Sequence, residues 1–228
     1  MNLDFTAEFS DPKLISARIY EQIRKAIILR KLPEGQRIVE ADLTRAFRVS
    51  RSPIRDALKM LAADGFVDLI PYRGATVSGI SPENVREHYE IKAMVEGFAA
   101  YIGARRFTEE DISKLEGILA EMERHVARSN LEKVLEANFA FHKKIVDCVR
   151  NTRLSRFYES LTHSIRRFGT IGLTEPRFQK LSLKEHQEIL AAIRDKKPSL
   201  AEERTRNHAL NMSRRVLDYM KRADNGKS

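Results

Sequence analysis

Apolar residues in the first third of the chain recur first at a helical spacing and then in two short runs. Val39, Leu43 and Phe47 are four residues apart, which predicts a helix with one apolar face. A second helical stripe follows after a short turn, and its members are Ile54, Ala57, Leu58 and Leu61. The apolar runs 66–70 and 75–77 then predict two strands joined by a turn. This order of elements predicts a winged helix-turn-helix.

The opposite side of the second predicted helix is basic. Arg51, Arg55 and Lys59 are spaced four apart and therefore share one outward face. In a helix-turn-helix, the first turn of this helix reaches the base edges in the major groove of DNA. Ser50 and Ser52 add two hydroxyl groups to that turn. The alternative is an ordinary solvated basic face, but the position between a turn and a hairpin favours contact with DNA.

Local charge supports the same interpretation better than total charge does. The chain has a formal net charge of +9 at pH 7, spread over its whole length. Between residues 37 and 59, six Lys or Arg stand against three Asp or Glu. Phosphate contacts need clustered positive charge, so this local excess is the better indication of nucleic acid binding.

The pattern changes after residue 78, where apolar residues keep a helical spacing to the end of the chain. We therefore expect a winged helix-turn-helix DNA-binding domain over residues 1–78 and a helical domain over residues 79–228. Six helices with short connections predict an all-α bundle for the second domain, so the fold class is mainly α. The expected helices span residues 82–106, 108–128, 131–149, 153–169, 182–195 and 199–222.

Local signals mark several boundaries of these helices. Thr108, Ser182 and Ser199 each stand three residues before an acidic residue, a spacing typical of a capping box. Residues 170–180 contain a glycine and a proline, which predicts a loop.

One apolar stripe in the predicted bundle is interrupted by polar groups. It consists of Leu131, Leu135, Asn138, His142, Ile145 and Val149. Burying an unpaired amide or imidazole costs on the order of a few kcal/mol, so these two polar groups need partners. His186 and His208 share the apolar faces of two later helices. Imidazoles with one oxygen ligand suit Zn²⁺, Ni²⁺, Mn²⁺ or Fe²⁺, and the alternative is that each histidine bonds a carbonyl group or water.

Other charged residues of the bundle leave alternatives open. Lys92 and Glu96 are four residues apart, which favours a surface ion pair. The alternative is that Lys92 faces a cavity and binds an anionic effector, and Arg166 is a second candidate for that role. The pattern places no glutamate inward and contains no H-E-x-x-H motif, so a metalloenzyme would lack its general base. We therefore expect no enzymatic activity.

Cysteine content and hydropathy indicate the compartment. Cys148 is the one cysteine of the chain, which excludes an internal disulfide framework and fits a reducing cytoplasm. No apolar run is long enough to span a bilayer. We therefore expect a cytoplasmic protein without a membrane partner.

The first domain resembles the DNA-binding domain of the GntR family of bacterial repressors. The likeness covers about residues 12–78, and its motifs are VSRSPIRDAL, L-x-x-D-G-F-V and P-x-R-G-A-T-V. It implies DNA contacts by four residues at the start of the second helix and by the Arg-Gly pair of the wing. These residues are Ser50, Arg51, Ser52, Arg55, Arg73 and Gly74. Some members carry an arginine where this chain has Ala41, so one of their DNA contacts is missing here.

The second domain looks like the effector domain of the FadR branch, in its six-helix, VanR-like form, known as the FCD domain. The likeness rests on N-F-A-F-H ending at His142, on E-H ending at His186 and on N-H ending at His208. It implies a metal held by Asn138 and these three histidines. Metal-binding members use an acidic residue where this chain has Asn138, which supplies a neutral oxygen instead.

The two resemblances together imply a ligand-responsive transcriptional regulator, and more specifically a repressor. Such proteins are homodimers that bind pseudo-palindromic operators in double-stranded DNA and respond to a small organic acid. Three alternatives remain at this point: a metal-free effector sensor, a metalloenzyme joined to a DNA-binding domain, and an architectural DNA-binding protein without a ligand.

Overall fold

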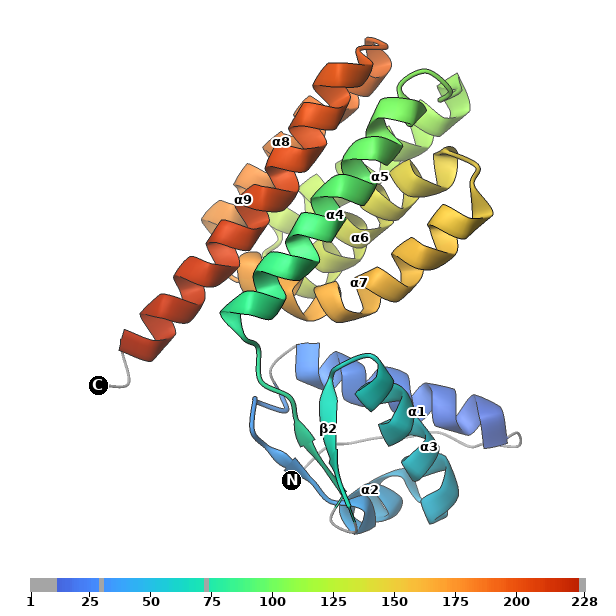
Figure 1. Cartoon of the computed structure of the whole chain (residues 1–228), viewed down its shortest axis with the longest axis vertical. Coiled ribbons are helices and arrows are strands. Elements are labelled where there is room, and N and C mark those ends of the chain that lie inside the picture. Colours follow the sequence, from blue (N-terminus) through green and yellow to red (C-terminus); the bar gives the residue numbers. More distant parts are fainter. Residues whose placement is uncertain (1–11, 29–30, 72–73, 226–228) are drawn as a thin grey trace. The chain divides into compact units, whose positions relative to one another are not determined.

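The computed structural model describes residues 12–28, 31–71 and 74–225, with all of their side chains except those of residues 12–14, 163–167 and 223–225. The chain divides into two compact units, the first ending at Ile80 and the second beginning at Ser81. The first combines helices with a small sheet, and the described part of the second contains only helices (Figure 1).

The first unit packs its helices against a three-stranded sheet. Its described elements are α1 (Pro12–Ile28), β1 (Arg37–Ile38), α2 (Glu40–Phe47), α3 (Arg51–Ala63), β2 (Val67–Ile70) and β3 (Gly74–Val77). The sheet is antiparallel with the order β1-β3-β2, so β2 and β3 form the expected hairpin. The two predicted apolar stripes meet in one core, in which Leu43, Ile54 and Leu61 are fully buried. The predicted winged helix-turn-helix is confirmed.

Two backbone positions define the turn and the wing. Arg48 ends α2 in the left-handed region, with φ of 54°, and its N–H donates to the carbonyl of Thr44. Gly74 begins β3 with φ of +93°, where a Cβ atom would lie 2.4 Å from the carbonyl oxygen of Ile38. A side chain at Gly74 would therefore collide with β1, so glycine is required here for the sheet itself.

The described part of the second unit is a bundle of six helices, as predicted. They are α4 (Pro82–Gly103), α5 (Glu109–Ala127), α6 (Leu131–Cys148), α7 (Thr152–Gly172), α8 (Pro176–Arg194) and α9 (Pro198–Asn225). Helix α4 packs against α9, α6 and α7 (Figure 1). Gly97 allows the close approach of α9, because a Cβ atom there would lie 2.5 Å from Cγ of Arg206. Within the described ranges, no helix has the length and hydropathy needed to cross a membrane.

Helix boundaries agree with the sequence in one half of the bundle and differ in the other. The capping box at Thr108 is confirmed, since Thr108 and Asp111 each accept a hydrogen bond from the other's backbone N–H. The predicted loop over 170–180 and the predicted helix start at Ser182 are wrong, because α7 continues to Gly172 and α8 already begins at Pro176. Proline lacks an N–H and is favourable in the first turn of a helix, so it starts α8 instead of extending the loop.

Candidate DNA-binding face and buried histidine site

The exposed start of α3 carries residues that the sequence assigns to DNA. Ser50 precedes the helix in an extended conformation, and Arg51 and Ser52 are exposed in its first turn. Among the residues that the structure describes, the Arg51 guanidinium has no hydrogen-bond or ion-pair partner. A free guanidinium at this position can donate two parallel hydrogen bonds to a guanine edge or to a phosphate.

Arg55, one turn further along α3, has an intramolecular partner that the sequence did not indicate. Its Nε donates to both carboxylate oxygens of Glu40, at 3.0 and 3.3 Å. Glu40 is the first residue of α2, and its separation of fifteen positions from Arg55 matches no helical spacing. An exposed pair of this kind is worth about 1 kcal/mol or less, so DNA phosphates can compete for Arg55. Arg73, which was predicted to contact DNA from the wing, lies outside the described residues.

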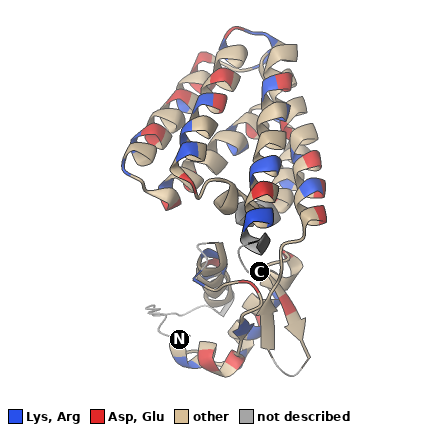
Figure 2. Ribbon diagram, turned by 90° about the vertical axis from the view of Figure 1, so that its left-hand side faces the viewer, with Lys and Arg blue, Asp and Glu red and all other residues tan. Residues whose placement is uncertain are grey.

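Charges of both signs are mixed along the described helices of the second unit (Figure 2). The DNA-binding face is therefore recognised by its fold and by the local excess of charge around α3, and not by the net charge of the chain.

Three histidine side chains converge inside the helical bundle. His142 of α6, His186 of α8 and His208 of α9 are each 2% exposed or less. His186 Nε2 lies 3.1 Å from His142 Nε2 and 3.2 Å from His208 Nε2. The predicted convergence of these three histidines is confirmed, and their ligand atoms all lie within 4.8 Å of one another.

Two of these rings have a carboxylate beside Nδ1, one from the partly buried Glu185 and one from the fully buried Glu96. His208 Nδ1 donates to Glu185 Oε2 at 2.8 Å, and Glu185 Oε1 accepts from Arg215 at 2.6 Å and from Asn211 at 3.0 Å. His142 Nδ1 lies 3.1 Å from Glu96 Oε2, a close contact that is not a hydrogen bond. A carboxylate beside Nδ1 favours the tautomer that carries its proton there. The Nε2 atoms of both rings then present lone pairs to the centre of the site.

This arrangement fits a cation at the centre. The Nε2 proton of His186 can serve only one of the two facing lone pairs, and the other lone pair would be left without a donor. Nitrogen ligands at about 2.0–2.1 Å from one metal ion are about 2.9–3.4 Å apart in right-angled to tetrahedral arrangements. The two Nε2 separations that involve His186, 3.1 and 3.2 Å, fall in this range, and the ligand atoms of all three histidines lie within 4.8 Å of one another.

The protonation state of the histidines is also compatible with a metal ion at the centre of the site. Burial lowers the pKa of His142 from 6.5 to about 4, and burial also lowers the pKa of His186 and of His208. All three rings are therefore neutral near pH 7, which is the form that binds metals.

Two further buried atoms near the histidines lack a partner within the described part of the chain. Asn138 is 5% exposed and lies one helical turn before His142 on α6, and its Oδ1 accepts no hydrogen bond. His186 Nδ1 is also buried without a partner. The unsatisfied amide oxygen of Asn138 is available to bind a metal ion, which is the role that the sequence predicts for it. Without a ligand or donor, the free energy lost by removing this oxygen from water is not offset.

The structure corrects two expectations about α4. Lys92 and Glu96 were expected to form a surface pair, but they are 4% and 0% exposed and form an ion pair inside the bundle. Glu96 also accepts a hydrogen bond from the Tyr158 hydroxyl, so the expectation that no glutamate points inward is wrong as well. The reason is that α4 is covered on several sides by α6, α7 and α9. A Lys and a Glu four residues apart give the same sequence pattern whether the pair is exposed or buried, so the sequence alone could not distinguish the two cases.

Electrostatic partners oppose the effect of burial on the pKa of each member of this pair. Burial alone would raise the pKa of Glu96, but His142 and Lys92 outweigh it and hold the pKa below its ordinary value. Burial lowers the pKa of Lys92, and Glu96 opposes that shift. Glu96 contacts both Lys92 and His142, so Lys92 lies next to the histidine site. The side chain of Arg166, the second candidate for effector binding, lies outside the described residues.

We expect the metal-free protein to lose stability as the pH falls from about 6.5 towards 4. The folded state lowers the pKa of His142 to about 4, so the unfolded chain binds protons first on acidification. Glu96 changes the stability in the same direction. A lowered carboxyl pKa stabilises the fold fully above the unfolded pKa, and this stability is lost progressively as the pH falls below it. Thermal unfolding of chelator-treated protein between pH 7 and 4 measures this. A melting temperature that stays constant over the window would contradict the neutral, buried state of the histidines.

Comparison with known proteins assigns each half of the chain to a known domain family. Residues 15–77 match the family described as bacterial regulatory proteins, gntR family, and residues 87–211 match the FCD domain. An uncharacterized HTH-type transcriptional regulator of Bacillus subtilis, YdhC, is 27% identical over 84% of this chain and 86% of its own length. The HTH-type transcriptional repressor RspR of Escherichia coli is 24% identical over 89% of each chain.

The fold agrees with these sequence matches. The solved structure of E. coli McbR/YncC superimposes with a TM-score of 0.75 at 17% identity, covering 92% of this chain and 98% of that one. The matched families and relatives are transcriptional regulators and not enzymes. The chain belongs to the GntR family of bacterial transcriptional regulators and carries an FCD domain behind its winged helix-turn-helix.

Proposed function

We propose that this regulator is a repressor whose binding to a pseudo-palindromic operator is controlled by a small carboxylate bound beside a divalent metal. The observation that carries the proposal is the convergence of three neutral imidazoles on one point, with carboxylates beside two of their Nδ1 atoms. His142, His186 and His208 would hold the metal through Nε2, and Asn138 would supply an oxygen.

The ligand set narrows the choice of metal to the transition series. Imidazole nitrogens with one neutral oxygen suit Zn²⁺, Ni²⁺, Mn²⁺ or Fe²⁺. Four protein ligands contributed in this way leave positions open on an ion that prefers five or six. The metal would supply a fixed positive charge to which an anion can bind.

Charge balance inside the bundle favours an anionic effector. Glu96 is paired with Lys92, and Glu185 is paired with Arg215. The imidazoles and the Asn138 amide are neutral, so a divalent ion would leave about two positive charges uncompensated in a buried site. A carboxylate effector would offset them. Lys92 has three ammonium N–H groups, of which the described residues occupy one through Glu96, and we propose it as a second contact for the acid.

Binding to a pseudo-palindromic operator requires two recognition helices at a fixed distance and orientation, one for each half-site. We infer that the protein acts as a homodimer, because a two-fold axis relates the half-sites of a pseudo-palindromic operator. The names of relatives such as RspR, a repressor, support repression as the direction of control.

The test uses an operator fragment selected from a random DNA pool with the purified protein. Its affinity is measured for metal-loaded and for chelator-stripped protein, with and without mono-, di- and tricarboxylates. We expect at least one acid to change the affinity about tenfold or more, and only when metal is present. An equal response in stripped protein would indicate a metal-free sensor. No response to any of the acids with metal present would overturn the carboxylate effector.

A further inference from the structure

Buried polar atoms without a partner gather beside the histidine cluster. In the described part of the second unit, five buried side-chain atoms have no hydrogen-bond partner, and four of them belong to α6 and α8. On α6 they are Oδ1 of Asn138 and Nδ1 of His142, and on α8 they are Oγ of Ser182 and Nδ1 of His186. The two residues of each helix are four positions apart and therefore share one face. Asn138 has a proposed role as a metal ligand, and His142 Nδ1 contacts Glu96. The two atoms on α8 have no role so far.

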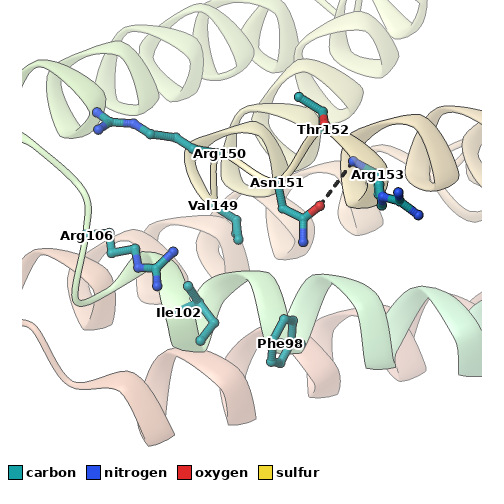
Figure 3. A pocket seen from close by; sticks show the side chains of 8 residues that line it. All are labelled: Phe98, Ile102, Arg106, Val149, Arg150, Asn151, Thr152 and Arg153. Carbon is teal, nitrogen blue, oxygen red and sulfur yellow. Dashed lines mark hydrogen bonds between the residues drawn. The ribbon is translucent and has the colours of Figure 1, made fainter.

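Polar groups at the surface of the second unit are in a different situation. A pocket of about 500 Å³ lies between the end of α4 and the turn from α6 to α7 (Figure 3). Asn151 in this pocket accepts hydrogen bonds from the backbone N–H groups of Arg153 and Leu154. The arginines that line the pocket, Arg106, Arg150 and Arg153, are exposed, so water satisfies their guanidinium groups. A buried hydroxyl or imidazole has no water, and its desolvation is costly unless a protein group or ligand bonds it.

Side-chain direction on α8 places the two unpaired groups next to each other. A long or aromatic side chain in a helix leans back over the turn that precedes it, towards the residues three and four positions earlier. The His186 ring therefore covers the turn that carries Ser182, and both residues are 0% exposed. A buried hydroxyl in a helix often bonds the carbonyl four residues earlier, as Thr205 on α9 does with Ala201 at 2.7 Å. Ser182 makes no such bond within the described residues, so its hydroxyl is available to the ring.

The two tautomers of His186 make opposite demands on a partner of Nδ1. Its Nε2 lies 3.1 and 3.2 Å from the Nε2 atoms of the other two histidines. In the metal-free protein a proton on Nε2 bonds one of these atoms, and Nδ1 then needs a donor. When Nε2 binds a metal, the proton is on Nδ1, which then needs an acceptor. A hydroxyl can donate and accept, whereas the ionised carboxylates of Glu96 and Glu185 beside the other two rings can only accept.

We propose that the Ser182 hydroxyl is the hydrogen-bond partner of His186 Nδ1 and positions this ring for metal binding. For the metal-bound state the proposal rests on the metal site of the proposed function. The hydroxyl donates to Nδ1 in the metal-free protein and accepts from Nδ1–H when Nε2 binds a metal. The ring stays neutral in this change, since it loses one proton at Nε2 and gains one at Nδ1. Rotation about the Cα–Cβ bond of Ser182 carries its Oγ across the helix face that the ring covers.

Calorimetric titration of the chelator-stripped, full-length protein with Zn²⁺ tests the metal-bound state. Ser182→Ala should weaken Zn²⁺ binding by about 10- to 100-fold, the usual effect of losing a group that orients a ligating histidine. The matched control is Ser213→Ala, the same change at another buried serine in a helix. Ser213 lies five positions after His208 on α9 and therefore on another face, so its variant should keep the wild-type affinity. Circular dichroism checks that both variants are folded, and wild-type affinity in folded Ser182→Ala would overturn the proposal.

Nitrogen-15 NMR of the histidine side chains tests the pairing without any metal. The chemical shifts of the two ring nitrogens report which one carries the proton and whether the other accepts a hydrogen bond. In the metal-free protein, Ser182→Ala should shift the Nδ1 signal of His186, and Ser213→Ala should leave it in place. The signal is assigned by its loss in His186→Ala.

The two measurements separate this proposal from the proposed function. An unchanged Nδ1 signal in folded Ser182→Ala would overturn Ser182 as the partner of His186, even if the wild-type protein binds Zn²⁺ tightly. If the wild-type protein binds no Zn²⁺ better than about 1 mM, the metal site of the proposed function fails. The metal-free Nδ1 signal then decides alone whether the serine and the histidine are paired.

Discussion

Replacing His186 by alanine should abolish high-affinity binding of a divalent transition metal, with a loss of at least about 100-fold. His186 Nε2 is the atom that approaches both other imidazoles, at 3.1 and 3.2 Å, so its removal opens the ligand set at the centre. The measurement is calorimetric titration of chelator-stripped protein with Zn²⁺, Ni²⁺ and Mn²⁺, together with metal analysis of the protein as purified. His88→Ala is the matched control, because His88 lies on α4 outside the cluster and bonds the carbonyl of Asn84.

The opposite change is expected at Asn138. Asn138→Asp should tighten metal binding by about tenfold or more, because an anionic oxygen replaces a neutral one at a buried position. The same change would reduce the positive charge that attracts a carboxylate, so effector affinity should fall while metal affinity rises. A merely structural role for Asn138 would predict no gain in metal affinity. If wild-type protein binds no divalent ion better than about 1 mM, equivalent to roughly −4 kcal/mol, the metal proposal fails.

The carboxylates around the histidines have a weaker, indirect effect in this scheme. Glu185 touches His208 Nδ1 and is held by Arg215 and Asn211, so it orients the ring instead of binding the ion. Groups in this position usually contribute about 10- to 100-fold to metal affinity. If the proposed metal site is right, we expect loss of any one of the three histidines to reduce metal affinity more than loss of Glu185 does.

Much of this site follows from helical spacing, because a stripe of apolar residues fixes which side chains point inward. His142 lies on such a stripe with Leu135 and Ile145, and the structure buries all three. The same logic placed Ile54 and Leu61 in the core and left Arg51 on the surface. Periodicity therefore predicts burial where one helix face is apolar and the other is polar.

Periodicity fails where a helix is covered on several sides. Helix α4 buries Lys92 and Glu96 as well as its apolar residues, so its sequence has no clean polar face. A Lys and a Glu four residues apart then look like a surface pair, although they lie beside His142. Contacts between distant elements are also invisible to spacing. The link from Glu40 to Arg55 depends on how α2 meets α3.

Replacing Arg51 by alanine should weaken operator binding by roughly 1–3 kcal/mol if it reads a base edge. Arg51 is exposed in the first turn of α3, and its guanidinium has no partner among the described residues that DNA would have to displace. Arg55→Ala should cost less than Arg51→Ala, because Arg55 must first leave Glu40. The measurement is fluorescence anisotropy with the selected operator and with an unrelated duplex at several salt concentrations.

Salt dependence separates the two kinds of contact. Loss of a base contact lowers specific affinity alone, whereas loss of a phosphate contact weakens all sequences and reduces the salt slope by about 1. Glu40→Gln should free Arg55 and strengthen binding to both duplexes, which a purely structural pair would not do. Lys114→Ala is the control, since it removes one exposed positive charge from α5 in the other unit. Wild-type affinity in the double variant Arg51→Ala and Arg55→Ala would show that α3 is not the helix that reads the operator.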